Sequence, residues 1–113
     1  MKTQRMSGKA LQKSIIDLAH LYNWKCAHFQ SVLATRKDGS ASWRTPVQAD
    51  GKGFPDVFMV RDRRALAVEV KGDGDTVKPE QAAWHYAIGK TAVEMYVWTP
   101  ESWRNGAVES ILR

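Results

Sequence analysis

Two short apolar runs joined by a polar turn constrain the fold of this chain more than any other feature of its sequence. The runs cover residues 57–60 (VFMV) and 66–71 (LAVEVK), and the turn covers residues 61–64 (RDRR). Near-continuous apolar runs of this length indicate β-strands in the centre of a sheet. A two-residue loop at 62–63 and a four-residue loop over 61–64 give one register, which places Asp56 opposite Glu69, Phe58 opposite Ala67 and Val60 opposite Ala65.

This register brings charged side chains together at one end of the hairpin. Opposed residues share a face, with Cβ atoms about 5 Å apart, and Lys71 shares the face of Glu69 because it lies two residues further on. Opposed like charges destabilise a sheet, so Asp56 and Glu69 require a compensating cation. We therefore predict a Mg²⁺ (or Mn²⁺) site formed by both carboxylates and the carbonyl of Val70, since these ions prefer hard oxygen ligands. The alternative is an ion pair at a strand end, which contributes little.

The spacing of an acid two residues before a lysine is weak by itself. Residues 50–52 (DGK) have the same spacing in a glycine-rich segment without strand context. Glu69 differs because it ends an apolar strand and lies in register with Asp56. Pro55 fixes its own φ and lacks a ladder donor, so it defines where the strand starts and where Asp56 points.

The remaining elements predict a small α/β fold of one domain over residues 1–113, with a mixed central sheet and flanking helices. A helix capped by Ser7 carries the apolar stripe Leu11, Ile15, Leu18 and Tyr22, and Asn23 ends it. A second helix starts at Pro79 and has Trp84, Ala87 and Ile88 on its core side. The elements in order are a helix at 8–22, strands at 24–30, 57–60 and 66–71, a helix at 79–90, a strand at 93–98 and a helical turn near 103, while the pattern of 107–112 is ambiguous.

Charge indicates a polyanionic partner. The net charge is +5, and residues 1–55 hold nine Lys or Arg against three acids. A basic half beside a carboxylate cluster fits nucleic acid, although solubility is the simpler explanation. Residues 31–53 are rich in Gly, Ser and basic residues, and so long a connection is typical of a binding element. The predicted DNA contacts are Arg36, Lys37, Trp43, Arg44, Lys52 and Lys78.

Two features of the 31–53 segment leave alternatives open. Trp43 is placed to stack on an unpaired base, or to anchor the loop. Gly51 and Gly53 allow either close approach of a phosphate chain or simple turn geometry.

Several classes of protein are disfavoured. The single cysteine, Cys26, excludes an internal disulfide, and its spacing from the three histidines does not fit a zinc site. No apolar run reaches the length of a membrane span and the N-terminus lacks a secretion signal, so we expect a cytoplasmic protein. Trp24, Trp84 and Trp98 fall at core-like positions, which gives little support to a protein-interaction module.

Residues 53–56 (GFPD), 69–71 (EVK) and 79–81 (PEQ) together resemble the VRR-NUC family of the PD-(D/E)xK nuclease superfamily, over about residues 7–98. The resemblance implies a restriction-endonuclease-like core of αβββαβ order and a metal-dependent DNA endonuclease. Small stand-alone members, typical of phages, are homodimers selective for branched DNA such as the Holliday junction. By the same resemblance Asp56 and Glu69 bind the metal, Lys71 serves the nucleophilic water, Gln81 lies beside the site, and Gln12 is an accessory residue.

Two positions depart from the family pattern or leave a role open. Family members usually carry a Glu near the start of the first helix, where this chain has Gly8 and Lys9, and the only acid on that helix is Asp17. The second hypothesis is therefore a catalytically weakened or inactive DNA-binding module of the same fold. Gln81 has an alternative role as a capping residue in the first turn of its helix, where Lys78 replaces the usual Ser or Thr.

Overall fold

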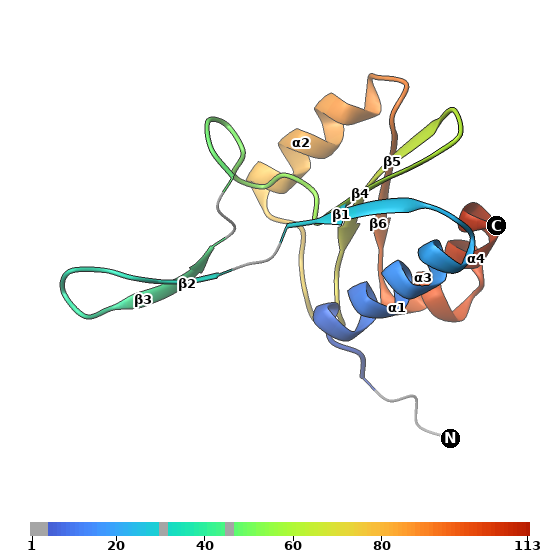
Figure 1. Cartoon of the computed structure of the whole chain (residues 1–113). Helices are drawn as coiled ribbons and strands as arrows, with labels where there is room; N and C mark the ends of the chain where they lie inside the picture. The colour runs from blue at the N-terminus through green and yellow to red at the C-terminus, as the bar shows by residue number, and fades with distance from the viewer. Residues whose placement is uncertain (1–4, 30–31, 45–46) are drawn as a thin grey trace.

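A four-stranded mixed sheet with helices on both faces forms the body of the computed structural model, which describes residues 5–29, 32–44 and 47–113 (Figure 1). The strand order is β1 (Lys25–His28), β4 (Val57–Arg61), β5 (Arg64–Val70) and β6 (Glu94–Trp98), with β6 parallel to β5 and the other pairs antiparallel. The helices are α1 (Gly8–Leu21), α2 (Pro79–Gly89), α3 (Pro100–Arg104) and α4 (Ala107–Leu112). The predicted α/β fold is confirmed and is consistent with a restriction-endonuclease-like core.

The central hairpin has the predicted register. Phe58 pairs with Ala67 and Val60 pairs with Ala65. Because Arg61 also pairs with Arg64, the connection is the two-residue alternative, and Asp62 takes a positive φ of 54° in it. Side chains alternate across β5, so Leu66, Val68 and Val70 face one side while Glu69 and Lys71 face the other.

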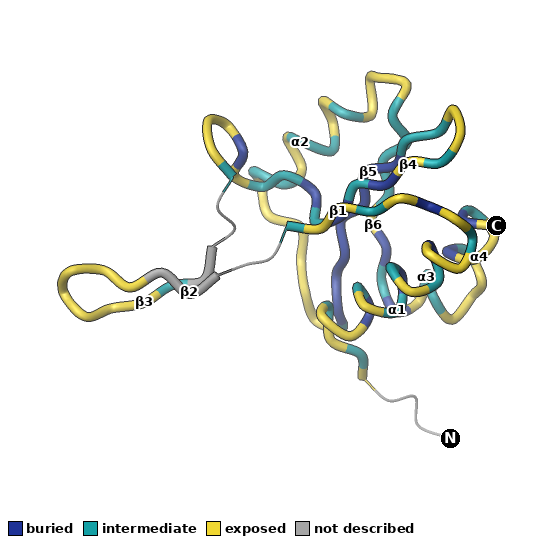
Figure 2. Tube along the Cα trace, viewed as in Figure 1, coloured by how far each residue is buried: buried dark blue, intermediate teal, exposed yellow. Residues whose placement is uncertain are grey.

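The hydrophobic core lies between the sheet and α1 and α4. Its helical part includes Leu11, Ile15 and Ala19 of α1 with Val108 and Leu112 of α4. Figure 2 shows the buried segments gathered on the central strands and the inner sides of these helices. Ser7 caps α1 by accepting from the Ala10 N–H, and Asn23 ends it with a φ of 69°, as predicted.

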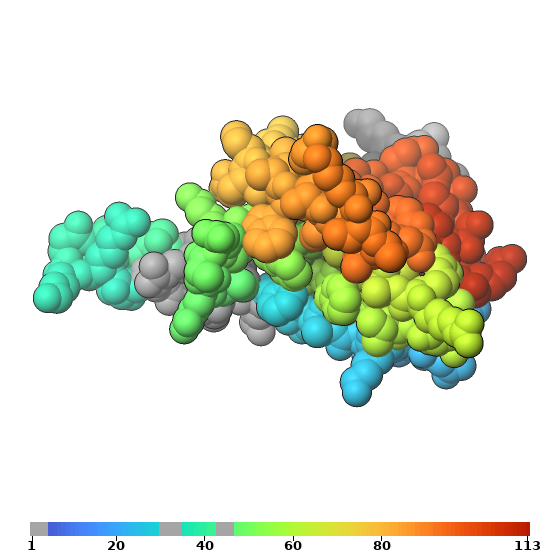
Figure 3. Space-filling model, turned by 90° about the horizontal axis from the view of Figure 1, so that it is seen from above, coloured from blue at the N-terminus to red at the C-terminus, as the bar shows by residue number. Residues whose placement is uncertain are grey.

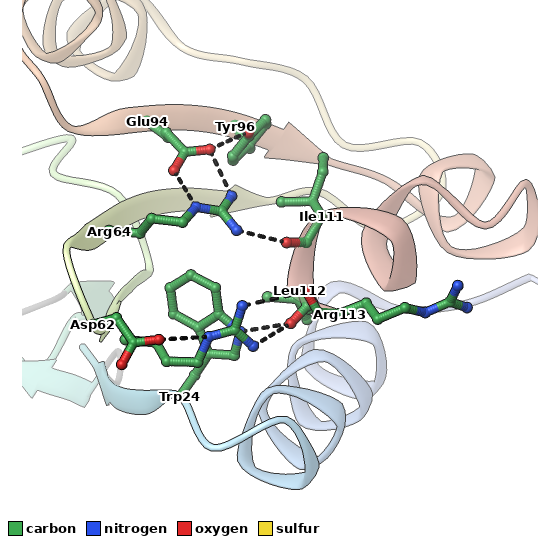
Figure 4. Close-up of polar contacts among 9 residues, drawn as sticks. Trp24, Asp62, Arg64, Glu94, Tyr96, Ile111, Leu112 and Arg113 are labelled. Carbon is green, nitrogen blue, oxygen red and sulfur yellow. Dashed lines mark hydrogen bonds and ion pairs between the residues drawn. The ribbon is translucent and has the colours of Figure 1, made fainter.

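The C-terminal helix, which the sequence pattern left ambiguous, is held by the hairpin turn. Arg61 donates to the carbonyl of Leu112, and Trp24 donates to the same oxygen from Nε1 at 2.8 Å. Arg64 donates to the carbonyl of Ile111 and, with two nitrogens, to the Glu94 carboxylate (Figure 4). These donors satisfy carbonyls that a helix end leaves unpaired. Arg61 and Arg64, which flank the two-residue turn, are thus structural.

The segment predicted as a long loop contains a hairpin. Strands β2 (Val32–Thr35) and β3 (Ala41–Arg44) pair antiparallel and project from the body of the molecule (Figures 1 and 3). Its turn is closed by an Arg36 N–H to Ser40 carbonyl bond of 2.7 Å. The sequence analysis did not predict these strands, because they are four residues long and pair locally, without the apolar alternation that marks a sheet strand.

The predicted core stripe on α2 was wrong. All residues of α2 are described, none of them is buried, and Ala87 is exposed. The reason is that α2 covers the polar face of β5, where Glu69 and Lys71 lie, whereas α1 and α4 cover the apolar face. Trp24 and Trp98 are buried as predicted, but Trp84 is only half-buried, edge-on to Phe54. In the described part of the chain, no helix has the length and apolarity to cross a membrane.

Candidate active site

Asp56 is fixed at the start of β4 by its neighbours on both sides. Its main-chain carbonyl accepts from the Phe29 N–H at 3.0 Å, and its Oδ2 accepts from the Val70 N–H at 2.8 Å. The Asp56 carboxyl also lies close enough to that of Glu69 to raise the pKa of Glu69. The register read from the sequence therefore does bring the two carboxyl groups into contact.

The surroundings of Glu69 disfavour the ionised form of its carboxyl group. Its side chain is 1% exposed. Burial, followed by the hydrogen bond and negative charge of Asp56, raises the pKa of Glu69 to about 8, against the opposing charge of Lys71. A Glu69 carboxyl that keeps its proton near neutral pH beside Asp56 is suited to exchange that proton for a cation. The donor chemistry of this pair thus fits a hard divalent ion.

Lys71 and Gln81 form the next part of the site. Lys71 Nζ donates to Gln81 Oε1 at 2.8 Å and lies 3.8 Å from Glu69 Oε2. The same Gln81 oxygen accepts from the main-chain N–H of Lys78 at 2.8 Å. Both roles considered for Gln81 are therefore present: it caps the start of α2 and it contacts the site.

His85 also lies in the site, and sequence reasoning missed it. It follows Gln81 by one helical turn, and its Nε2 is 3.2 Å from Glu69 Oε1. Burial, and then the charge of Lys71, lowers the pKa of His85, while Asp56 opposes this. His85 lies four residues after Gln81, so both side chains lie on one face of the helix. This spacing is the sequence signal that could have identified His85 as a site residue.

The carbonyl of Val70 faces the start of α1. A Cβ built on Gly8 would lie 4.0 Å from this oxygen and 3.4 Å from Oδ2 of Asp75. The first turn of α1, which is fully described, holds no acidic residue. Gln12, one turn later, bonds His28 of β1 at 3.3 Å rather than a carboxylate of the site. Across residues 5–29, 32–44 and 47–113, no three His, Cys, Asp or Glu side chains are grouped to hold a metal ion.

The predicted DNA contacts are placed apart from one another. Lys78 is exposed at the start of α2, beside Gln81, and Lys52 is exposed in the loop that packs against α2. Arg36 and Lys37 are exposed at the tip of the β2–β3 hairpin. Trp43 and the adjacent Arg44 lie in β3, but their side chains fall outside the described set.

Gly53 is required by the start of α2. Its φ is +88°, and a Cβ there would lie 2.6 Å from the carbonyl carbon and oxygen of Glu80 and 2.9 Å from the Gln81 nitrogen. A Cβ on Gly51 would collide with Val47 of its own loop. The two roles considered for these glycines were close approach of a phosphate chain and turn geometry. The contacts support turn geometry, together with close packing of Gly53 against the start of α2.

Gly53→Ala is expected to destabilise the protein and displace Gln81, because the methyl group cannot be placed without moving α2. The cost should exceed the ~1–3 kcal/mol of the strained φ alone. Gly106→Ala is the matched control, since Gly106 has a φ of +83° with nothing within 4 Å of a Cβ. Denaturant unfolding of the two variants separates strain from collision, and equal losses would contradict this role of Gly53.

One of three comparisons with known proteins gave a match. A family model described as VRR-NUC domain matches residues 5–100. The match spans the central hairpin, α2 and β6. No curated protein and no solved structure matches the chain.

Proposed function

The chain belongs to the VRR-NUC domain family, which implies a nuclease of the PD-(D/E)xK type, and from this premise we propose that it is a divalent-metal-dependent DNA endonuclease selective for branched DNA. The observation that carries the proposal is the carboxyl pair formed by the buried Glu69 and the half-buried Asp56, with Lys71 beside it. Burying two like charges is costly unless they are compensated. A pair of this kind at a strand end therefore supports the proposal of a catalytic role.

In the proposed mechanism, Asp56, Glu69 and the carbonyl of Val70 would hold Mg²⁺ or Mn²⁺. The bound ion would acidify water and offset negative charge on the phosphate. Lys71, held by Gln81 Oε1, orients the attacking water and balances the charge that develops on the phosphate oxygens. The water oxygen forms a bond to phosphorus, the bond to the leaving sugar oxygen breaks, and that oxygen takes up a proton.

For DNA binding, we propose that basic side chains grip the phosphate backbone on either side of this site. Lys78 lies at the start of α2, Lys52 lies in the loop that packs against α2, and the hairpin carries Arg36 and Lys37 at its tip. Trp43 and Arg44 follow in the second hairpin strand. Binding through several phosphates should weaken steeply as salt is raised.

We propose that the active form is a homodimer. Two copies related by a two-fold axis would present two sites to one branched substrate, as paired cuts require. Light scattering of the free protein and of its DNA complex tests this proposal, and a monomer in both would exclude it.

The direct test of the proposed function is cleavage of junction, flap and duplex DNA with Mn²⁺ and with chelator. We expect metal-dependent nicking that is strongest on branched DNA and falls at least about 10²-fold in Lys71→Ala, because the phosphate charge is then unbalanced. Lys90→Ala, which changes an exposed lysine packed over Tyr86, is the control. Full activity in Lys71→Ala would remove the mechanism.

The first turn of α1 favours a second candidate function. Because this turn has no carboxylate, a further acidic ligand next to the Val70 carbonyl would have to come from an element other than the first turn of α1. A DNA-binding module with weakened or lost catalysis would bind the same DNA panel, with the same salt dependence, and leave it uncut under Mn²⁺. That result would select this alternative.

A further inference from the structure

The two oxygens of Glu69 have different surroundings. His85 Nε2 lies 3.2 Å from Oε1. Gln81 Nε2 and Lys71 Nζ approach Oε2 no closer than 3.5 and 3.8 Å. Hydrogen bonds from nitrogen weaken beyond about 3.2 Å, so among these three nitrogen donors the closest one, His85 Nε2, faces Oε1.

The position of His85 is not explained by core packing. Every residue of α2 is described and none is buried, yet the His85 side chain is only 15% exposed because it fills the space over the polar face of β5. An imidazole carries an N–H on one ring nitrogen when neutral and on both when protonated, whereas an ionised carboxylate only accepts. Against an ionised Glu69, the nitrogen facing Oε1 must therefore be the donor.

We propose that His85 is a positioning residue of the metal site, which holds Oε1 of Glu69 by a hydrogen bond from Nε2 and leaves Oε2 for the cation. The inference rests on the proposed function, because it assumes that Glu69 is a metal ligand. A carboxylate can turn and present either oxygen to an ion. Partners that fix the orientation of a ligand typically change metal affinity 10–100-fold.

The test compares two amide substitutions with opposite expectations. The side-chain nitrogen of glutamine reaches about as far from the backbone as Nε2 of histidine, whereas that of asparagine is one bond shorter. His85→Gln should bind Mn²⁺ within about threefold of the wild type, and His85→Asn at least about tenfold more weakly. Binding of Mn²⁺ to the free protein is measured by electron paramagnetic resonance, without DNA, with unfolding temperatures as the check on folding.

Cleavage gives a second readout. Weak binding alone should raise the Mn²⁺ concentration needed for half-maximal rate in His85→Asn and leave the rate at saturation near that of the wild type. His20→Asn, at an exposed position of α1, is the matched control.

Three results would overturn the inference. Wild-type affinity in His85→Asn, or an equal loss in both amide variants, would mean that no donor at this position orients Glu69. A wild-type protein that binds no Mn²⁺ would remove the metal site altogether and the proposed function with it. The first two results leave the proposed function intact, so the two failures are distinguishable.

Discussion

Glu69→Gln is expected to abolish metal-dependent cleavage while making the metal-free protein more stable at pH 8. A carboxyl whose pKa is raised from 4.5 to about 8 on folding keeps a proton that the unfolded chain has lost. The stability of the wild type therefore falls as pH rises between these values, by up to about 1.4 kcal/mol per pH unit. A neutral amide does not titrate and escapes this loss.

The activity of the same variant should fall for a separate reason. An amide at position 69 removes one of the two negative charges proposed to hold the cation, and we expect a loss of at least about 10³-fold at a fixed Mn²⁺ concentration. At pH 8 without metal, the free energy of unfolding should rise by on the order of 2–4 kcal/mol. Cleavage assays and denaturant unfolding measure the two effects.

The control for Glu69→Gln is Glu101→Gln, since Glu101 is exposed on α3. It should leave both properties nearly unchanged. A Glu69→Gln variant that is less stable than the wild type at pH 8 would mean that the ionised carboxylate is already compensated in the metal-free fold. The basis for a cation at this pair would then be lost.

Metal affinity is expected to rise with pH up to about 8. Because the Asp56–Glu69 pair retains a proton below the raised pKa of Glu69, a cation must displace that proton to bind. The dissociation constant for Mn²⁺ should fall about tenfold per pH unit, hence about 100-fold between pH 6 and pH 8, and level off above.

Calorimetric titration of the protein with Mn²⁺ in two buffers of different ionisation enthalpy checks this prediction directly. Close to one proton should be released per ion at pH 6 and almost none at pH 9. The unfolding temperature of the metal-free protein should decrease from pH 7 to pH 8, above the range in which His85 titrates in the unfolded chain, and saturating Mn²⁺ should reduce this decrease. Equal affinity at pH 6 and pH 8 would show that the pair is ionised before metal binds.

Local pattern alone was sufficient for the central hairpin. The pairing of Phe58 with Ala67 follows from two apolar runs and a short turn, because strand register repeats every two residues. The same register brought Asp56 against Glu69. The first helix followed from an apolar stripe, a serine cap and Asn23 in a left-handed conformation.

The errors occurred where burial depends on what an element packs against. The composition of α2 resembles that of a core helix, yet this helix lies over the charged face of β5 and buries no residue of its own, all of them being described. Its histidine therefore contacts Glu69, and nothing in the spacing of His85 from other histidines or from Cys26 could show this. In the sequence, Arg61 and Arg64 indicate only a polar turn. In the structure, their side chains donate hydrogen bonds to carbonyls of the C-terminal helix.

The sequence by itself determined the strand register and, with it, the placing of Asp56 near Glu69, because both are set by neighbours within about fifteen residues along the chain. Tertiary structure alone decided that Glu69 is buried, that α2 supplies Gln81 and His85 to it, and that α1 brings no acid to the Val70 carbonyl. Burial and the pKa of Glu69 depend on every element packed around one side chain. The order of residues does not specify that arrangement until the helices have packed on the sheet.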